Sequence, residues 1–343
     1  MKAIVIHAAN DLRIEDYKLE ACAENQVQIR IATGGVCGSD LHYFHNGGFG
    51  PVTLKQPMVL GHEVSGHVTE LGKNVSNLQV GDLVAVSPSR PCGHCRYCVQ
   101  GAHNQCLNMR FYGSAMPYPH IQGAFRETLN ADVSQCVSAK GITPAEAAMA
   151  EPLAVALHAM KQAGNLLGKR VLITGCGPIG VLCVLAARRA GAVEIVTTDL
   201  SDNALRFASD AGADLALNTG TNKDALSDYN NDKGYFDVLF ECSGAAPALV
   251  AALHAMAPGG VVVQLGLGGD MTLPMMAITG KELQLRGSFR FHEEFATAVE
   301  LMTKGLIDVK PLVTHTMPLE DSIEAFNIAS NRDVAMKAQI QFS

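Results

Sequence analysis

The sequence predicts an α/β protein in which a β-rich region precedes a parallel sheet packed against helices. Residues 1–150 consist mainly of short β-type segments separated by turns, and a helical pattern begins near Thr143. Beyond it, continuous β-branched runs alternate with helical runs, a pattern typical of a parallel sheet covered on both faces. At ~150 residues per domain, a chain of 343 residues corresponds to about two domains.

The composition excludes several classes of protein. The chain has 26 Lys and Arg against 33 Asp and Glu, a net charge of −7, which disfavours a protein that follows nucleic-acid phosphates. Its 10 Cys are about 3% of the residues, well short of the ~8–10% that marks a disulfide scaffold. The apolar runs are too short for a secretory signal or for the ~18 residues of a membrane span. We therefore expect a cytoplasmic protein without nucleic-acid or membrane partners, in which clustered cysteines indicate metal.

The elements of the first region follow from alternation and turn residues. Strands are expected at 26–32 and 80–86, and the long loops 47–57 and 88–121 are typical of segments that hold function or a metal. A helical pattern covers 143–167, starting at Thr143 as N-cap with Pro144 at the first helical position. Pro152 is expected to break or bend this helix.

The second region alternates strands and helices. Strands are expected at 170–174, 194–198, 236–240, 261–265 and 283–286, and helices at 179–190, 203–211 and 247–256. The tail from residue 293 returns to mixed helix and strand.

A glycine loop follows the first of these strands. Gly175-Cys176-Gly177-Pro178-Ile179-Gly180 opens a helix, and Asp199 ends the next strand. In this context the first glycine permits the turn, the second lets a pyrophosphate approach the backbone, and the third allows helix and strand to pack. The aspartate is suited to bind the adenosine ribose hydroxyls and to repel a 2′-phosphate. The loop predicts a dinucleotide site that favours NAD over NADP.

Four cysteines form a compact cluster in the long loop. Cys92, Cys95, Cys98 and Cys106 lie within 15 residues that contain almost no apolar side chains. A disulfide pair conflicts with the expected compartment, an iron–sulfur cluster with the polarity of the loop, and a nucleic-acid zinc ribbon with its scarcity of basic residues. The spacing predicts a closed structural zinc site.

A second set of metal-ligand types is dispersed along the chain. Cys37 lies 25 residues before His62, which adjoins Glu63, and no spacing rule joins the cysteine to this pair, so each residue taken alone is compatible with a structural role. Glu151 lies in an apolar stretch, where an unpaired carboxylate would cost several kcal/mol by a rough estimate. It is therefore a candidate ligand or a member of an ion pair.

Taken together and in order, these motifs resemble the zinc-dependent medium-chain alcohol dehydrogenase family. The resemblance spans essentially the whole chain and rests on Cys37-Gly38-Ser39-Asp40-x-His42, Gly61-His62-Glu63, the four cysteines, Glu151-Pro152-Leu153 and the glycine loop. Glu151, His42-Tyr43 and Gly287-Ser288-Phe289-Arg290 are similar to the sorbitol (polyol) branch. The resemblance implies a discontinuous GroES-like catalytic domain, residues 1–150 and 291–343, with the zinc lobe at about 88–112. A doubly wound Rossmann domain, residues 151–290, is inserted into it.

The resemblance also implies residue roles. Cys37, His62 and Glu151 would hold a catalytic zinc with one open position, and Glu63 would be an adjacent or alternating ligand. Ser39 would pass the substrate proton through the cofactor ribose to His42, with a zinc-bound water beside Glu151 as the rival route. Further cofactor contacts are expected from Leu265, Gly266, Leu267, Ser288, Phe289 and Arg290. Substrate contacts are expected from Tyr43, Phe111 and Arg290.

The function implied is oxidation of a secondary alcohol of a polyol or sugar acid, with two zinc ions per chain and NAD preferred. Use of NADP stays open, because Ala204 stands where polyol enzymes often place an arginine, and Arg206 lies two residues further on. The family resemblance implies a homodimer or homotetramer. Three alternatives are a sorbitol- or xylitol-type dehydrogenase, a zinc-stabilised dinucleotide-binding protein without turnover, and a zinc-free quinone reductase.

Overall fold

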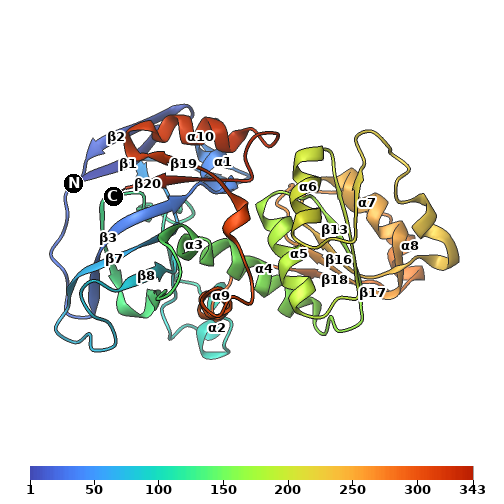
Figure 1. The fold of residues 1–343 in the computed structure, drawn as a ribbon, viewed down its shortest axis with the longest axis horizontal. Coiled ribbons are helices and arrows are strands. Elements are labelled where there is room, and N and C mark those ends of the chain that lie inside the picture. The colour runs from blue at the N-terminus through green and yellow to red at the C-terminus, as the bar shows by residue number, and fades with distance from the viewer. Residues whose placement is uncertain (343) are drawn as a thin grey trace. The chain divides into compact units, whose positions relative to one another are not determined.

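The computed structural model describes residues 1–342, which form two compact units. Unit 1 comprises Met1–Glu151, His292–Asn331 and the end of the chain from Lys337. Unit 2 comprises Pro152–Phe291 and Arg332–Met336. Figure 1 shows the blue N-terminal and the red C-terminal segments side by side in unit 1, which is therefore assembled from both ends of the chain.

Unit 1 is built around a seven-stranded sheet of order β12-β8-β7-β3-β20-β19, in which β11 also pairs with β3. Its strands are β3 (Gln26–Gly35), β7 (Glu63–Leu71), β8 (Leu83–Val86), β11 (Thr128–Asp132), β12 (Cys136–Ser138), β19 (Val313–Pro318) and β20 (Lys337–Gln341). The antiparallel pairing of β20 with β3 places Ile340 opposite Gly34 and joins the two ends of the chain in one sheet.

Smaller sheets complete unit 1. They contain β1 (Lys2–Ala8), β2 (Asp11–Asp16), β4 (Gly48–Phe49), β5 (Val52–Thr53), β6 (Met58–Val59), β9 (Ser89–Arg90) and β10 (Arg110–Phe111). The inward residues form one hydrophobic core that includes Ile29, Leu60, Val64 and Phe125. The ring of Phe125 packs edge-on against Phe326, so the C-terminal segment contributes to this core.

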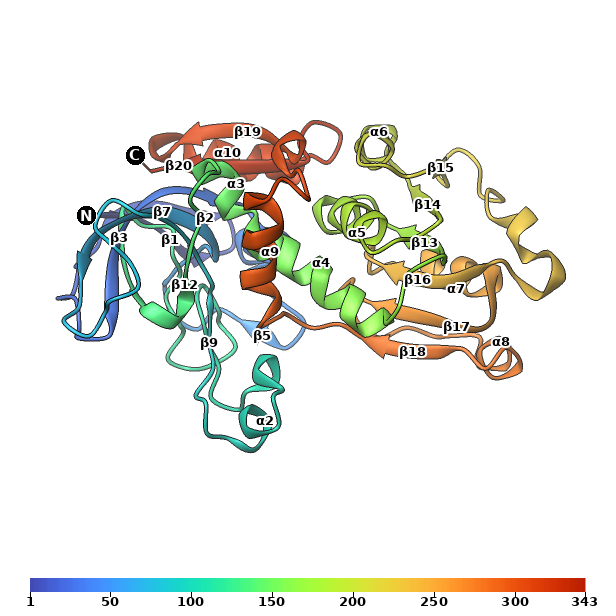
Figure 2. The same cartoon turned by 60° about the horizontal axis from the view of Figure 1, so that its bottom comes forward.

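The helices of unit 1 are short. They are α1 (Gly38–Asn46), α2 (Arg96–Val99), α3 (Pro144–Ala148), α9 (Glu294–Thr303) and α10 (Ser322–Ser330), with 3₁₀ turns at His103–Gln105, Val133–Gln135, Lys310–Leu312 and Leu319–Asp321. Figure 2 shows α2 in the lobe that projects from the sheet.

The expected helix at 143–167 is divided, but not at Pro152. Thr143 caps α3 and accepts a hydrogen bond from the N–H of Glu146, as predicted. The chain then interrupts the helix at Met149 and resumes in α4 (Ala150–Ala163). Pro152 lies in the first turn of α4, where a backbone N–H has no helical partner, so proline is tolerated there. The expectation of a break at Pro152 was wrong.

Unit 2 contains a six-stranded, wholly parallel sheet of order β15-β14-β13-β16-β17-β18. Its elements are β13 (Arg170–Thr174), α5 (Pro178–Arg189), β14 (Glu194–Asp199), α6 (Asp202–Asp210), β15 (Leu215–Asn218), a 3₁₀ segment (Ser227–Lys233), β16 (Phe236–Glu241), α7 (Ala246–Ala255), β17 (Met256–Gln264), α8 (Met275–Gly280) and β18 (Gln284–Gly287). The predicted doubly wound parallel sheet is confirmed, and its core is formed by apolar residues such as Leu172, Val196 and Leu239.

No helix among the described residues is both long and apolar enough to cross a membrane.

Candidate functional site

The glycine loop of unit 2 has the shape of a phosphate-binding turn. Gly175 has φ +85°, a conformation that favours glycine, and a Cβ on Gly180 would overlap the carbonyl oxygen of Gly175. By contrast, a Cβ on Gly177 would meet nothing within 4 Å, so the backbone is open there. Helix α5 starts at Pro178 with no side chain capping its N-terminus, which leaves backbone N–H groups for an anion.

Asp199 lies beside this loop. Its carboxylate accepts hydrogen bonds from the N–H groups of Cys176 at 2.6 Å, Leu200 at 2.7 Å and Ser201 at 2.9 Å. The structure therefore brings the predicted ribose-binding aspartate next to the glycine loop. The nearby Arg206 donates to the side chain of Asn203 at 3.0 Å.

The other predicted cofactor residues follow β17 and β18. The N–H groups of Leu265 and Gly266 donate to the Glu241 carbonyl oxygen at 2.9 Å, and Leu267 is exposed. The hydroxyl of Ser288 is buried and has no hydrogen-bond partner among the described residues. Since a buried hydroxyl is normally satisfied, this atom fits a site completed by a polar ligand. The residues of unit 2 are thus compatible with a bound dinucleotide.

Phe289 and Arg290 lie directly after Ser288. The Arg290 guanidinium lies 4.9 Å from the centroid of the Phe289 ring, and Arg290 has a left-handed φ of +57°. Non-glycine residues rarely adopt that conformation, and when they do they are often found at functional sites.

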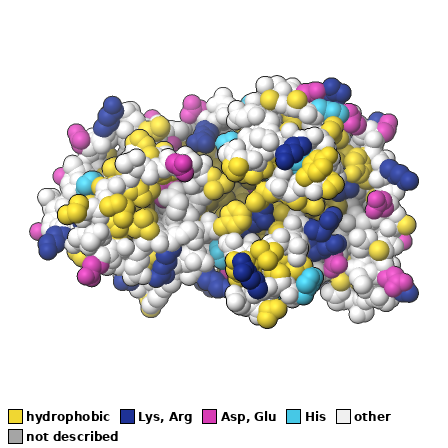
Figure 3. Space-filling view, turned by 180° about the vertical axis from the view of Figure 1, so that it is seen from behind, with side chains coloured by type: hydrophobic (Ala, Val, Ile, Leu, Met, Phe, Trp, Pro, Cys, Tyr) yellow, Lys and Arg dark blue, Asp and Glu magenta, His cyan; other side chains and the backbone are white. Residues whose placement is uncertain are grey.

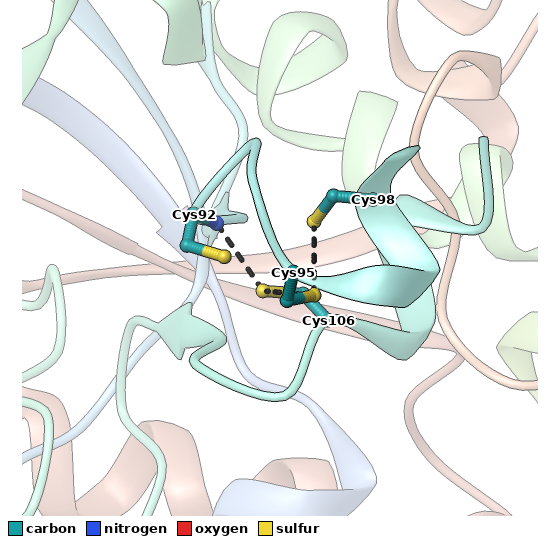
Figure 4. Close-up of side chains that lie close together, drawn as sticks. All are labelled: Cys92, Cys95, Cys98 and Cys106. Atoms are coloured by element: carbon teal, nitrogen blue, oxygen red, sulfur yellow. Dashed lines mark hydrogen bonds between the residues drawn. The ribbon is translucent and has the colours of Figure 1, made fainter. Parts of the chain in front are cut away.

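The four cysteines of the lobe converge in unit 1, as Figure 4 shows. Their sulfur atoms all lie within 4.8 Å of one another. The Sγ–Sγ distances are 3.5 Å for Cys95 and Cys98, and 4.0 Å for Cys95 and Cys106. Four thiolates arranged tetrahedrally at Zn–S bonds of ~2.3 Å would be about 3.8 Å apart, so the cluster fits a closed zinc site.

Backbone N–H groups stabilise thiolates in this lobe. The N–H of His94, more than any other group, lowers the pKa of Cys92 to about 5. The N–H groups of Cys92 and Asn108 donate to the sulfur of Cys106 at 3.2 Å and 3.3 Å. Thiolates are the zinc-binding form of cysteine, so the turn geometry favours metal binding.

A second group of ligand types also lies in unit 1. Ligand atoms of Cys37, His62 and Glu63 all lie within 4.8 Å of one another. Cys37 is the N-cap of α1, His62 precedes β7 and Glu63 begins it. The tertiary fold therefore joins residues that no sequence spacing connects.

A buried carboxylate, Asp40, lies beside the histidine of this group. Its carboxylate is wholly buried, accepts hydrogen bonds from the N–H groups of Cys37 at 3.1 Å and Gly61 at 3.2 Å, and lies 3.7 Å from Nδ1 of His62. Histidine ligands commonly direct their second nitrogen to a carboxylate, which leaves Nε2 for the metal. No role was predicted for Asp40, although it stands inside the cysteine motif.

Lys337 is the second residue that the sequence did not reveal. Its ammonium is buried and contacts both carboxylate oxygens of Glu63 at 2.8 Å and 2.9 Å and the carbonyl oxygen of Val36 at 3.2 Å. Burial alone would lower the pKa of Lys337, but the Glu63 carboxylate raises it above its ordinary value. The sequence offers no clear signal for this role, because Lys337 is the first residue of β20, a strand that also contains Gln339 and Gln341.

Glu151 lies outside the group of three. Its side chain is buried, and burial raises the pKa of Glu151 to about 8, with Glu63 and Cys37 adding to the increase and His62 opposing it. Burial and then Glu63 raise the pKa of the Cys37 thiol to about 12. Cys37, Glu63 and Glu151 thus bring a thiol and two carboxyl groups close to the buried Lys337, a donor set that fits a divalent metal ion, whose binding favours their deprotonated forms.

The other residues of unit 1 that were predicted for catalysis or for substrate binding differ in their surroundings. The Ser39 hydroxyl lies 3.5 Å from Nε2 of His62, and His42 is exposed on α1. The ring of Phe111 lies 5.7 Å from that of His62, so Phe111 adjoins the group. Tyr43 is 2% exposed, and its hydroxyl accepts a hydrogen bond from the N–H of Ala115 at 3.0 Å, so much of this side chain serves the core.

Comparisons with known proteins agree with this arrangement. The chain matches the family model of the alcohol dehydrogenase GroES-like domain over residues 23–141 and that of the zinc-binding dehydrogenase over 178–304. It is 46% identical to L-idonate 5-dehydrogenase (NAD(P)(+)) of Escherichia coli K12, over 93% of this chain and 92% of that protein. It is 35% identical to sorbitol dehydrogenase of Bos taurus, over 99% and 95%. The crystal structure of the Escherichia coli L-idonate 5-dehydrogenase superposes with a TM-score of 0.92 at 42% identity, covering 99% of this chain and 97% of that one.

Proposed function

Because this chain belongs to the zinc-dependent alcohol dehydrogenase family, we propose that it oxidises a secondary alcohol of a sugar acid with NAD(P). The proposed substrate pair is L-idonate and 5-keto-D-gluconate, interconverted reversibly. The observation that carries this proposal is the 46% identity, across nearly the whole chain, to a relative of that named activity. The buried group of Cys37, His62 and Glu63 supplies the matching chemistry.

Two zinc ions per chain are proposed. Cys37, His62 and Glu151 would hold the catalytic ion, with Glu63 as an adjacent or alternating ligand, and Cys92, Cys95, Cys98 and Cys106 would hold the structural one. The catalytic ion, when bound, supplies Lewis-acid polarisation of the substrate hydroxyl oxygen. Since both carboxylate oxygens of Glu63 contact Lys337, ligation by Glu63 requires that ion pair to loosen.

The side chains around the catalytic group have separate tasks. Asp40, whose carboxylate lies 3.7 Å from Nδ1 of His62, is proposed to fix the ring so that Nε2 is left for the metal. The Ser39 hydroxyl, beside that nitrogen, is proposed to accept the proton of the substrate hydroxyl as it releases its own toward His42, which is exposed and exchanges a proton with solvent. A water beside Glu151 is the rival relay. Phe111 contributes an apolar wall next to His62.

The glycine loop and Asp199 are proposed to bind the dinucleotide, which accepts the hydride. The carboxylate of Asp199 disfavours a 2′-phosphate, and Arg206 is engaged with Asn203, so NAD is the proposed preference. Leu265, Gly266, Leu267, Ser288 and Phe289 complete the cofactor site.

A carboxylate on the substrate calls for a cation, and Arg290 is proposed to supply it. The planar guanidinium of arginine matches a carboxylate in a two-point contact. In this role Arg290 separates a sugar-acid substrate from a neutral polyol. Tyr43 and Phe111 are proposed to shape the rest of the substrate pocket.

We propose that the protein forms a homo-oligomer through the edge of the unit 2 sheet. Every residue of β18 is exposed, Leu285 among them, and Met275 and Met276 of the adjoining α8 segment are 60% and 87% exposed. Figure 3 shows hydrophobic side chains (yellow) gathered on the surface of unit 2, at left in that view. An unpaired strand edge beside exposed methionines favours association with another copy.

The cytoplasm is the proposed compartment. None of the ten cysteines is in a disulfide, which supports this proposal.

The proposed function is tested with a panel of aldonates and polyols, assayed with NAD and with NADP, and read as kcat/KM. We expect L-idonate with NAD to give the highest value. A higher value for sorbitol or xylitol would assign the chain to the polyol alternative represented by its sorbitol dehydrogenase relative. Binding of cofactor without oxidation of any compound, or full activity of Cys37→Ala, would contradict the proposed mechanism.

A further inference from the structure

One buried carboxylate at the carboxyl end of the unit 2 sheet has no basic partner within residues 1–342. Glu241 is the last residue of β16, and its side chain is 0% exposed. The groups that donate to it are all neutral: the N–H and hydroxyl of Ser243, the N–H of Gly244, the hydroxyl of Thr174 and the amide of Gln264. Burying a carboxylate is costly unless its hydrogen bonds are well satisfied, so this arrangement calls for a reason beyond packing.

Glu241 joins three neighbouring strands. Its Oε1 accepts a hydrogen bond from the hydroxyl of Thr174, the last residue of β13, at 3.3 Å. Its Oε2 accepts one from the amide of Gln264, the last residue of β17, at 2.5 Å. In the sheet, β14 lies on one side of β13, whereas β16 and β17, which come later in the chain, lie on the other side of β13. Glu241 therefore stands where the strand order reverses, and nucleotides bind parallel sheets at this point.

The same carboxylate fixes the turn after β16. Its oxygens accept hydrogen bonds from the N–H of Ser243 at 2.9 Å and from the N–H of Gly244 at 3.0 Å and 3.1 Å. The backbone of this turn packs directly against two other loops at the carboxyl end of the sheet, the glycine loop and the segment that follows β17. A Cβ on Gly175 would lie 2.7 Å from the nitrogen of Ser243, and a Cβ on Gly268 would overlap the carbonyl oxygen of Gly244.

We propose that Glu241 is a positioning residue for the dinucleotide. By holding the Ser243–Gly244 turn, it sets the spacing between the glycine loop and the segment at Leu265–Leu267, two parts of the proposed cofactor site. This inference rests on the proposed function, because it assumes that these segments bind a dinucleotide. Glu241 acts through backbone that it orients and is not proposed to touch the reacting atoms.

The test is Glu241→Gln. It keeps the shape of the side chain but presents an amide NH₂ to groups that are themselves donors. We expect the dissociation constant for NADH, followed by NADH fluorescence, and the KM for NAD to rise at least roughly tenfold. The kcat at saturating NAD should fall less than about threefold. Glu146→Gln, which alters a buried glutamate in the cap of α3, is the matched control and should leave NADH affinity unchanged.

A second variant covers the case in which Glu241→Gln does not fold. Thr174→Val keeps the side-chain volume and removes one donor to the carboxylate. Weaker NADH binding at an unchanged thermal midpoint supports the proposal. If Glu241→Gln folds, NADH affinity within twofold of the unaltered protein overturns the proposal. If Glu241→Gln does not fold, the same result in Thr174→Val overturns it. Failure of the unaltered protein to bind NADH would instead refute the proposed function.

Discussion

At the scale of single residues, the acidic groups in and beside the candidate catalytic group outnumber the one buried cation that contacts them among the described residues. Cys37, Glu63 and Glu151 are acidic groups in or beside it, and Lys337 is the buried cation that contacts Glu63. The ion pair determines whether Glu63 is available as a ligand, because both of its carboxylate oxygens are engaged. The role of Lys337 can be separated from that of the proposed metal.

Lys337→Met should destabilise the protein by about 3–5 kcal/mol, because it leaves the buried Glu63 carboxylate without its partner. Adding Glu63→Gln to this variant should recover much of the loss, since the uncompensated charge is then removed. The measurement is urea unfolding followed by far-UV circular dichroism, with Lys337→Arg as the charge-conserving control. A single variant as stable as the unaltered protein would contradict this account.

Arg290→Met should discriminate between substrates by charge. Loss of charge-assisted hydrogen bonds worth about 1.5–3 kcal/mol should raise the KM for an aldonate roughly tenfold or more. The KM for a neutral polyol should change little. Steady-state kinetics with both substrates at saturating NAD measures the difference. Equal increases for both, or an increase only in the KM for NAD, would remove Arg290 from carboxylate recognition.

At the scale of elements, the glycine loop and the zinc lobe, the two ligand motifs predicted from local sequence, differ in what occupies their centres. The glycine loop is defined by space left open for a ligand beside Gly177 and by backbone contact at Gly180. The zinc lobe is defined by sulfur atoms that fill its centre in place of a hydrophobic core. Each design predicts a distinct response to substitution.

Gly177→Ala and Gly180→Ala should therefore differ, although they lie three residues apart. The new Cβ at residue 177 meets nothing within 4 Å, so stability should be unchanged while NADH affinity falls roughly tenfold or more. The new Cβ at residue 180 overlaps the carbonyl oxygen of Gly175 and should cost about 1–3 kcal/mol of stability. Thermal unfolding and NADH titration of both variants test this contrast. Retained NADH affinity in Gly177→Ala would argue against a pyrophosphate at the loop.

Cys95→Ala should remove one zinc ion per chain and unfold the lobe, because metal replaces a core there. Elemental analysis should give about one zinc, and trypsin should cleave within residues 88–112, where Arg96 and Arg110 lie. Cys136→Ala, which removes a buried thiol of the same unit outside both clusters, should retain two ions and resist cleavage. Unchanged zinc content in Cys95→Ala would contradict the structural site.

At the scale of the whole molecule, the sheet of unit 2 has two edges of different character. Strand β18 at one edge is exposed along its full length, and β15 at the other contains half-buried residues. The edge at β18 is the proposed contact between copies of the chain.

Leu285→Lys in β18 should shift the protein toward monomers, because it places a charge in the proposed interface. Leu215→Lys in β15 is the matched control, since it introduces the same charge at the opposite edge of the same sheet and at a similarly exposed leucine. Sedimentation velocity over a range of protein concentrations distinguishes the two. Equal behaviour of both variants would exclude β18 as the contact.

Much of this molecule was predictable because several features are local in sequence. The strands and helices expected in unit 2 end within a few residues of the observed ones, apart from the longer β17, since β-branched runs and helical periodicity reveal buried parallel strands. The short β15 and α8 were not expected. The position of the helix interruption was not predictable in the same way. A proline signals a break only in the interior of a helix, and Pro152 lies in a first turn.

The sequence by itself determined the four-cysteine cluster and the glycine loop, because their ligand-binding groups lie within one short segment each. Only the tertiary structure decided the surroundings of Cys37 and His62, which α1 and β7 bring together with Asp40. It also decided that Lys337, 274 residues away from Glu63, is its buried partner. Such contacts depend on which strands pair across unit 1, and sheet pairing is set by the packing of the whole core rather than by local spacing.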